Sequence, residues 1–293
     1  MKLSALRELN KAVDMTRKQV LLVGGTAGIG RAMALRLAKA KADVVVAGRS
    51  VSRGEELTQE MQSLAGPGPK FRFMACDASL LRNTRQLADK FEKDHARLDY
   101  LVMTHCIATI QGRTETSEGL DVKLALHYYS RMALIQHFLP YLTASSGRVL
   151  TVLSAGVHAP YTGYASDVAL KQSYSLKNAA DAAGFYTDVG LSMYAEENPE
   201  VSFIHTCPGF VASSWGTEMP TLLRVPIRLL QSLFGKSSED CAEFMCAPLF
   251  DTDLGPGFHL RGEFAELASV ADTTEEAKPL VWKHTQEVLR SCS

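Results

Sequence analysis

The sequence predicts an α/β protein with a doubly wound parallel sheet in a single domain. Short apolar runs rich in β-branched residues alternate with longer helical patterns, as in strands joined by crossover helices. Several of the short runs are apolar throughout, which is typical of strands covered on both faces. A glycine-rich turn follows the first run. The alternation continues nearly to the end of the 293 residues without a repeat or a low-complexity segment, so one domain is expected.

The individual elements follow from this alternation. The predicted strands are Val20–Val23, Val44–Ala47, Phe71–Ala75, Tyr100–Met103, Val149–Leu153, Val201–Thr206 and Phe258–Leu260. The predicted helices between them are Ile29–Ala40, Arg53–Leu64, Leu80–Lys93, Leu120–Leu142 and Ser173–Glu197.

Two segments stand outside the pattern, and the predicted domain itself covers residues 19–293. Residues 1–18 form an amphipathic N-terminal helical arm, which we expect to pack on the surface. Residues 213–250 are rich in apolar side chains and follow a strand end, where loops often cover a site. They form either a lid-like segment or a pair of helices that closes the core. Their apolar residues include Trp215, Met219, Leu222, Leu223, Leu229, Leu230 and Phe234.

Composition narrows the class of protein. The net charge of −1 offers no basic face for nucleic acid or anionic lipid, so a small-molecule partner is expected. No apolar run reaches the roughly 18 residues that a membrane span needs. The charged N-terminus lacks the apolar core of a secretion signal. The six cysteines are scattered, which favours free thiols in a reducing cytoplasm over a metal site at Cys241 and Cys246.

The turn Val23–Gly30 predicts a dinucleotide site on a Rossmann fold. Gly24 allows a tight turn after the strand, and Gly28 and Gly30 let backbone N–H groups approach a pyrophosphate at the start of a helix. The spacing GxxxGxG differs from GxGxxG, but the strand before it and the helix after it are those that the motif requires. Thr26 and Ile29 complete the predicted phosphate-binding turn.

The end of the second strand predicts NADP(H) as the cofactor in preference to NAD(H). An NAD site places an acidic residue here to bind the ribose 2′-hydroxyl. This chain has Gly48 at that position and Arg49 next to it. A guanidinium group suits a 2′-phosphate. Arg31 either assists or is a solvent-exposed side chain.

Four further motifs, taken in order with the glycine turn, resemble the short-chain dehydrogenase/reductase family over about residues 19 to 212. The residues from Ile107 to Pro140 are similar to a fungal subgroup of it. The resemblance implies that Asp77 contacts the adenine, that Ser154 is catalytic, and that the segment after the sixth strand covers the nicotinamide through Pro208, Gly209 and Val211. The motifs are Val23–Gly30, Cys76–Ser79, Leu98–Val102, Gly147–Ser154 and Pro208–Val211.

The catalytic half departs from the family pattern. Met103-Thr104-His105-Cys106 replaces the usual Asn-Asn-Ala-Gly, and His127 stands where the family has a catalytic asparagine. Imidazole both donates and accepts, so His127 could anchor a water in a proton relay. The alternative is a histidine that packs its helix. His105 is either directed at the cofactor or part of a pocket wall.

The family's Tyr-x-x-x-Lys is absent, and its closest counterpart is Tyr174-Ser175-Leu176-Lys177. Residues three apart share a helix face, so Tyr174 and Lys177 form a plausible catalytic pair if the helix begins near Ser173. The alternative is an ordinary helix tyrosine beside a solvated lysine. Tyr161, Tyr164 and Tyr186 are rival proton donors.

Counting from the flanking motifs does not identify the base. The usual distance after Ser154 leads to Asp167, with Lys171 four residues on. The usual distance before the Pro-Gly pair leads instead to Asn178 and Ala182. An insertion is therefore expected between Ser154 and Pro208.

The function predicted from these residues is an NADPH-dependent oxidoreductase that reduces a carbonyl, or oxidises the alcohol, of a small and fairly apolar molecule such as a secondary metabolite. The altered catalytic residues leave two alternatives: a non-redox isomerase, dehydratase or cyclase, and a non-catalytic NADP-binding protein. The family likeness implies a homodimer or homotetramer paired through Leu120–Leu142 and Ser173–Glu197.

Overall fold

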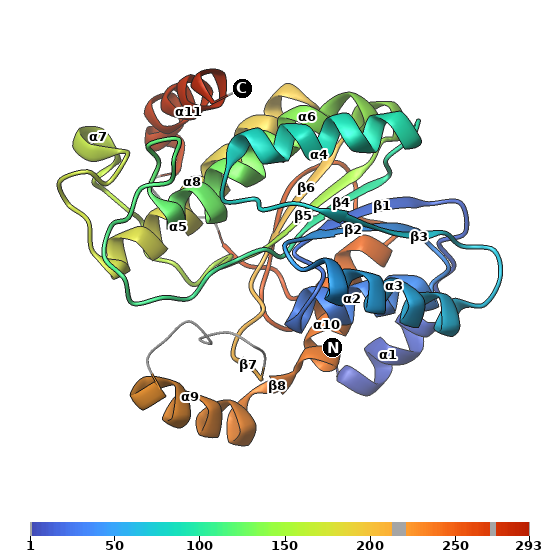
Figure 1. Ribbon diagram of the computed structural model, residues 1–293. Coiled ribbons are helices and arrows are strands. Elements are labelled where there is room, and N and C mark those ends of the chain that lie inside the picture. The colour runs from blue at the N-terminus through green and yellow to red at the C-terminus, as the bar shows by residue number, and fades with distance from the viewer. Residues whose placement is uncertain (1, 213–220, 270–273, 293) are drawn as a thin grey trace.

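A computed structural model describes residues 2–212, 221–269 and 274–292. Seven parallel strands form one sheet in the order β3-β2-β1-β4-β5-β6-β9 (Figure 1). Both ends of each predicted strand lie within one residue of the observed bounds, which confirms the doubly wound sheet. The strands are β1 Gln19–Val23, β2 Asp43–Gly48, β3 Phe71–Ala75, β4 Tyr100–Met103, β5 Arg148–Val152, β6 Ser202–Thr206 and β9 Gly257–Arg261.

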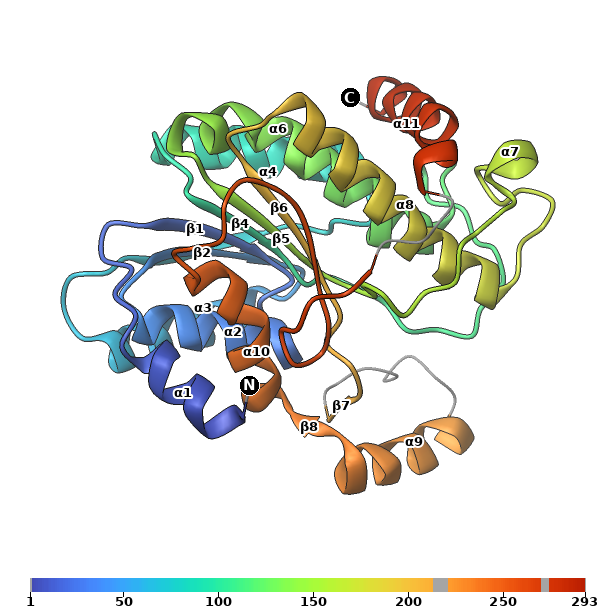
Figure 2. The ribbon, with the colours of Figure 1, turned by 180° about the vertical axis from the view of Figure 1, so that it is seen from behind.

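Helices cover both faces of the sheet, as Figures 1 and 2 show from opposite sides. One face carries α2 (Gly28–Lys39), α3 (Val51–Ala65) and α10 (Ser238–Phe250). The other carries α4 (Leu81–Asp94), α6 (Ser130–Ser145) and α8 (Leu176–Glu197). Two apolar cores result, one on each face, because strands buried on both sides must be covered on both sides. Strand order reverses between β1 and β4, the usual ligand position in such sheets.

The predicted helix over Leu120–Leu142 is interrupted. It begins with α5 (Val122–Leu124), where the Asp121 carboxylate accepts hydrogen bonds from the backbone N–H groups of Lys123 and Leu124. A π-helical turn, η1 (Ala125–Tyr129), then precedes α6. Such turns are frequent at functional sites, and this one contains His127.

The helix predicted over Ser173–Glu197 begins later than expected. The Asp167 carboxylate, at the end of α7 (Tyr164–Asp167), accepts hydrogen bonds from the backbone N–H groups of residues 171, 172 and 173. These bonds hold the chain in a turn. Ser175 then caps the helix by accepting from the Asn178 N–H group, so α8 begins at Leu176.

The N-terminal segment contains α1 (Leu3–Lys11), which packs on α10. Asn10 donates to the carboxylate and the backbone carbonyl of Glu243, and Arg7 forms an ion pair with Asp240. Leu6 is buried, whereas Leu9 is exposed.

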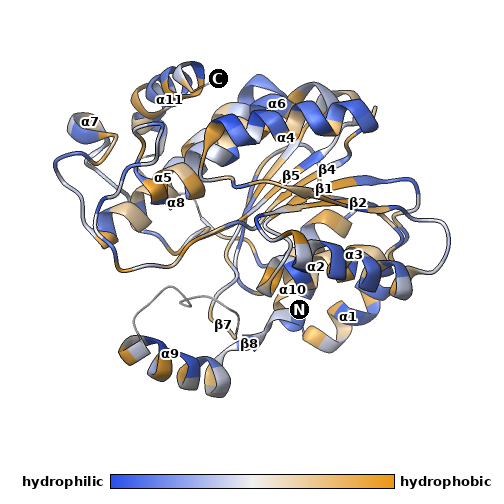
Figure 3. Ribbon diagram, in the orientation of Figure 1, coloured by the Kyte–Doolittle hydropathy of each residue, from blue (hydrophilic) through white to orange (hydrophobic). Residues whose placement is uncertain are grey.

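The segment 213–250 divides into two helices of different character. In α10 both Cys241 and Cys246 are buried, so this helix closes the core over α2. By contrast, α9 (Thr221–Phe234) projects from the body beside β7 (Val211–Ala212) and β8 (Lys236–Ser237), and Figure 3 shows both hydrophobic and hydrophilic residues along it. Trp215 and Met219 lie outside the described residues, as do the side chains of Leu223 and Leu229.

The C-terminal helix α11 (Thr274–Ser291) packs on α8, and Tyr128 and Tyr129 bond to its Thr285 and His284. It covers part of the face through which the family likeness implies pairing. That part is not available to a second copy of the chain. Among the described residues, no helix has both the length and the apolar character needed to cross a bilayer.

Candidate active site

The glycine turn brings three backbone segments into close contact at the carboxyl edge of the sheet. Gly24 has φ +93°, and a Cβ atom there would lie 2.4 Å from the backbone nitrogen of His105. A Cβ on Gly30 would lie 2.4 Å from the carbonyl oxygen of Gly24. Only glycine fits at both positions. Gly28, with φ +53°, begins α2, and Ile29 packs against the core.

This turn fits a pyrophosphate. Ala27 precedes α2 and has no side-chain group to cap it, so the first N–H groups of the helix are not satisfied by a side chain. Those groups and the helix dipole favour an anion. When bound, a nicotinamide cofactor supplies or accepts a hydride at the substrate carbon.

A cavity of about 360 Å³ lies at the ends of β2 and β3, where such a cofactor would place its adenosine. Arg49 and Lys90 bring positive charge to it, and Asp77 is its acidic residue. The Asp77 carboxylate already accepts from the N–H and hydroxyl groups of Ser79. The cavity is lined by Arg49, Ala75, Cys76, Asp77, Asn83, Gln86, Leu87 and Lys90.

Gly48 is restricted by its contact with the glycine turn. A Cβ there would lie 2.9 Å from the Cγ2 atom of Thr26, so an acidic side chain at this position would need Thr26 to move. Arg31 forms an ion pair with Glu60 on α3.

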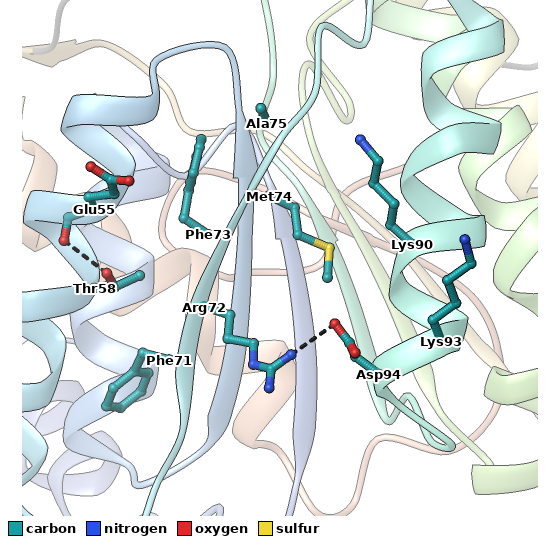
Figure 4. A pocket seen from close by; sticks show the side chains of 10 residues that line it. All are labelled: Glu55, Thr58, Phe71, Arg72, Phe73, Met74, Ala75, Lys90, Lys93 and Asp94. Carbon is teal, nitrogen blue, oxygen red and sulfur yellow. Dashed lines mark hydrogen bonds and ion pairs between the residues drawn. The ribbon is translucent and has the colours of Figure 1, made fainter.

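A larger cavity, of about 540 Å³, follows the open edge of β3 between α3 and α4 (Figure 4). Its strand residues run from Phe71 to Ala75, and an ion pair of 2.9 Å joins Arg72 to Asp94. Charged side chains of this kind protect an edge strand from pairing with another chain.

The carboxyl end of β5 places Ser154 in a buried cluster of ionisable groups. The Ser154 hydroxyl lies 3.4 Å from Nδ1 of His158, and that nitrogen lies 2.8 Å from the Ser154 carbonyl oxygen. On the other side of the ring, Nε2 of His158 forms an ion pair of 3.2 Å with the Asp188 carboxylate. The second oxygen of Asp188 lies 2.5 Å from Nδ1 of His205.

Helix α8 can approach this cluster because residue 184 is a glycine. A Cβ on Gly184 would lie 2.4 Å from the Ser154 hydroxyl and 2.6 Å from the His158 ring. One turn further along α8, Asp188 then reaches both histidines. The Ser154 hydroxyl is thus in direct contact with His158, and through it with the Asp188 carboxylate.

The pKa shifts follow from burial and these contacts. Burial opposes the charge on His158, but Asp188, the Ser154 carbonyl and Asp181 together raise its pKa. Burial would raise the pKa of Asp188, but the two histidines lower it. For His205, burial outweighs the attraction of Asp188 and lowers the pKa.

The expected helical pair of Tyr174 and Lys177 is not formed. Because α8 begins at Leu176, Tyr174 lies before the helix, and the two residues do not share a helix face. Lys177 is 75% exposed and forms an ion pair with Asp181. The Tyr174 hydroxyl instead accepts a hydrogen bond of 2.8 Å from the buried ammonium group of Lys123.

Asp167, the position that counting from Ser154 reaches, does not carry a free carboxylate. Asp167 bonds to the turn before α8, and those bonds lower its pKa to about 2 although burial acts in the opposite direction. Among the rival tyrosines, Tyr161 bonds to Ser173 and Tyr186 donates to the carbonyl of Val168.

His127 is a neutral imidazole with an assigned partner. Its Nε2 accepts a hydrogen bond of 2.9 Å from the Ile107 N–H group, after β4. Burial and the nearby Arg131 and Lys123 lower its pKa to about 3. The histidine therefore fixes the loop after β4 against the π-helical turn. His105 bonds to Ser130 through Nε2, and burial holds its pKa well below the usual value.

The segment after β6 lies at the same carboxyl edge. Pro208 accepts a weak hydrogen bond from the Cys241 thiol, and Val211 is buried in β7. Gly209 has φ +65°, and a Cβ there would meet the carboxylate of Glu263 at 1.9 Å.

Sequence reasoning missed Lys123, His158, Asp188 and His205. One signal was present: His158 follows Ser154 by four residues in the loop after a predicted strand. Asp188 within an otherwise apolar helix stretch and His205 within a buried strand were further signals, since buried charged groups require partners.

Comparisons with known proteins agree with this architecture. Residues 18–219 match the short chain dehydrogenase family. Oxidoreductase AN1596 of Emericella nidulans is 38% identical over 198 residues, which cover 66% of this chain and 58% of that protein. Short-chain dehydrogenase/reductase SAT2 of Stachybotrys chartarum is 32% identical over 249 residues, covering 76% of this chain and 70% of that protein.

Among solved structures, an alcohol dehydrogenase from the archaeon Thermococcus sibiricus, complexed with 5-hydroxy-NADP, superimposes with a TM-score of 0.65. It is 18% identical, and the match covers 86% of this chain and 99% of that one, which shows the shared fold. With the family match over most of its length and two fungal relatives above 30% identity, this chain belongs to the short-chain dehydrogenase/reductase family.

Proposed function

We propose that this protein is an oxidoreductase that uses NADP(H) to interconvert a carbonyl and an alcohol on a small, fairly apolar molecule. The observation that carries the proposal is the position of the Ser154 hydroxyl. It lies at the carboxyl end of β5, at the same edge of the sheet as the phosphate-binding turn, and it belongs to a buried acid–base cluster. A hydroxyl there can donate a hydrogen bond to a substrate oxygen without a change of charge.

Three observations support NADP(H) over NAD(H). Arg49 and Lys90 line the cavity at the ends of β2 and β3. Gly48 leaves the ribose 2′-hydroxyl without an acidic acceptor at the usual position. The carboxylate of Asp77, the acidic residue of the cavity, already bonds to Ser79.

An apolar substrate is supported by the loops that follow β4, β5 and β6. Each presents a large hydrophobic side chain to solvent: Ile110 is 45% exposed, Val157 is 68% exposed and Phe210 is 44% exposed. These loops surround the carboxyl edge where sheets of this kind bind ligands. An apolar molecule would remove these side chains from water.

The direct experiment follows NADPH absorbance with a panel of aldehydes and ketones that vary in apolar surface. Turnover by the wild type and its loss in Ser154→Ala, with NADPH affinity retained, is the expected result. Undiminished turnover in Ser154→Ala would remove the proposed role of the hydroxyl. Product formation without NADPH consumption would favour the non-redox alternative, for which the cluster offers acid–base groups.

A further inference from the structure

His158 has an unusual environment because both of its ring nitrogens face oxygen atoms that have no proton to give. Nδ1 lies 2.8 Å from the backbone carbonyl of Ser154, and Nε2 lies 3.2 Å from the Asp188 carboxylate. A neutral imidazole would direct one lone pair at one of these oxygens. The imidazolium form donates to the Ser154 carbonyl through Nδ1 and places its positive charge beside the Asp188 carboxylate at Nε2.

His205 is a neutral imidazole, and its hydrogen-bond partners determine which of its nitrogens carries the proton. Its Nε2 accepts the backbone N–H of Ser154 at 3.0 Å, so its single proton is on Nδ1, facing Asp188. With His158 as the imidazolium, the cluster holds one carboxylate, one imidazolium and one neutral imidazole. Its net charge is zero, which is the arrangement that burial favours.

We propose that His158 supplies the proton of the reaction through Ser154, in place of the tyrosine that the family uses. This proposal rests on the proposed function. His158 is a positioning residue in this scheme, because the group in contact with the substrate is the Ser154 hydroxyl. Asp188 holds the charge on His158, and His205 orients Asp188 and the Ser154 backbone.

The proton transfer balances without a further reactant. As the substrate oxygen gains negative charge, it takes the proton of the Ser154 hydroxyl, forming the alcohol O–H bond. The Nδ1–H bond of His158 breaks, and its proton restores the hydroxyl of Ser154 across their 3.4 Å contact. His158 is left neutral and takes a proton from solvent. The hydride that completes the reduction comes from the nicotinamide cofactor.

Three of the four tyrosine hydroxyls considered as proton donors engage other partners, and the ring of the fourth, Tyr164, stacks on Phe185. Tyr161 bonds to Ser173, Tyr174 accepts from Lys123, and Tyr186 donates to a backbone carbonyl. His158, by contrast, is already within hydrogen-bond distance of Ser154. The geometry therefore favours the histidine as the source of the proton.

The charged groups around His158 come from two elements. Helix α8 contributes the carboxylates of Asp188 and Asp181, both of which stabilise the imidazolium. Strand β6 contributes His205, which is neutral by its hydrogen bonds and whose pKa is lowered chiefly by burial. The pKa of His158 is raised as a result, which favours the imidazolium form that the geometry of its two ring nitrogens requires.

The first test needs no cofactor. Histidine Cε1–H signals are followed by NMR from pH 5 to 9 in wild type, His158→Gln, Asp188→Asn and His259→Gln. We expect one signal with a midpoint above the ordinary value near 6.5. This signal should vanish in His158→Gln and move to lower pH in Asp188→Asn. It should persist in the control variant His259→Gln, which removes a histidine of β9. A His158 midpoint at or below the ordinary value overturns the proposal.

The second test measures carbonyl reduction against pH. Wild-type kcat should fall above the NMR midpoint, because the imidazolium is then lost. His158→Gln should bind NADPH normally, lose kcat about 100-fold, as for a general acid, and lose this pH dependence. Full turnover in His158→Gln, or an unchanged basic limb, contradicts the proposal. Tyr174→Phe should keep most of its activity, and loss of activity equal to that of Ser154→Ala would assign the proton to Tyr174 instead.

The two tests separate the two proposals. A raised His158 midpoint together with no hydride transfer on any carbonyl would overturn the proposed function. Hydride transfer that is indifferent to His158 would overturn the proton route alone. If His158→Gln does not fold, Asp188→Asn and Ser154→Thr, which keeps the hydroxyl, replace it. In Asp188→Asn the fall of kcat at high pH should move to lower pH. A fall of kcat that stays at the wild-type pH contradicts the proposal.

Discussion

The Asp188 carboxylate and the His205 imidazole form a buried hydrogen bond of 2.5 Å that joins helix α8 to strand β6. The same carboxylate forms an ion pair with His158 in the loop after β5. One side chain thus holds together three elements at the carboxyl edge of the sheet. The consequences for stability, cofactor choice and pH dependence can be measured separately.

Asp188→Ala should lower the free energy of unfolding by about 3–5 kcal/mol, because it leaves a buried imidazolium without its partner. Asp181→Ala, on the same helix, is the comparison, because its carboxylate contributes less than that of Asp188 to the charge on His158. The Asp181 carboxylate pairs with the exposed Lys177, and about 1 kcal/mol is expected. Urea unfolding at pH 7 compares the two variants. Equal losses would mean that the Asp188 cluster has no special role in stability.

Arg49→Ala should weaken NADPH binding at least about tenfold, since a charge-assisted hydrogen bond contributes about 1.5–3 kcal/mol. NADH affinity should not change, because NADH has no 2′-phosphate. Arg31→Ala serves as the control, since its guanidinium pairs with Glu60. Fluorescence titration of wild type and both variants with each cofactor gives the six dissociation constants. Equal loss of affinity for NADPH and NADH would contradict the assignment of Arg49.

Buried neutral histidines should make the protein less stable in acid. The pKa of His127 is lowered to about 3, chiefly by burial, against an ordinary value of about 6.5 in the unfolded chain. Between these values only the unfolded state binds the proton, so stability falls as pH falls, by about 1.4 kcal/mol per pH unit for this group. His158 acts with the opposite sign, because its raised pKa adds stability at low pH that is lost as pH rises through the folded-state value.

Urea unfolding of the protein without cofactor, between pH 7.5 and 4.5, measures this slope. His127→Asn should reduce it by about one proton, while an amide oxygen remains to accept the Ile107 N–H group. A slope that His127→Asn does not change would show that His127 is already protonated in the folded protein.

Lys123→Met should destabilise the protein by about 1–3 kcal/mol, because the buried ammonium group bonds to the Gln111 carbonyl and to the Tyr174 hydroxyl. Lys177→Met should change stability by less than about 0.5 kcal/mol, as expected for an exposed side chain. Thermal unfolding of the two variants distinguishes them. The reverse order would restore Lys177 as the partner of Tyr174.

The sheet and the cofactor turn could be predicted because their signals are local. Strand periodicity reports burial within a few residues, and the glycines at 24, 28 and 30 report backbone geometry within one turn. Ser154 lies directly after a predicted strand, and its catalytic role was an implication of the family resemblance. The family resemblance added the order of the motifs, and the family match confirms it.

The start of α8 could not be predicted from periodicity. Its boundary depends on the Asp167 carboxylate, which bonds to three backbone N–H groups and delays the helix. Because α8 begins three residues later than predicted, Tyr174 lies before the helix that contains Lys177. Helix boundaries are set by such side-chain to backbone bonds, which compete with the helix itself.

The sequence by itself determined the fold class, the phosphate-binding turn and the serine at the end of β5. Only the tertiary structure decided which ionisable groups meet that serine. His158, Asp188 and His205 come from a loop, a helix and a strand, and His205 and Ser154 are 51 residues apart in the chain. Burial makes their pairing obligatory, but pairing across that distance depends on how the helix and the strands pack, which no local pattern records.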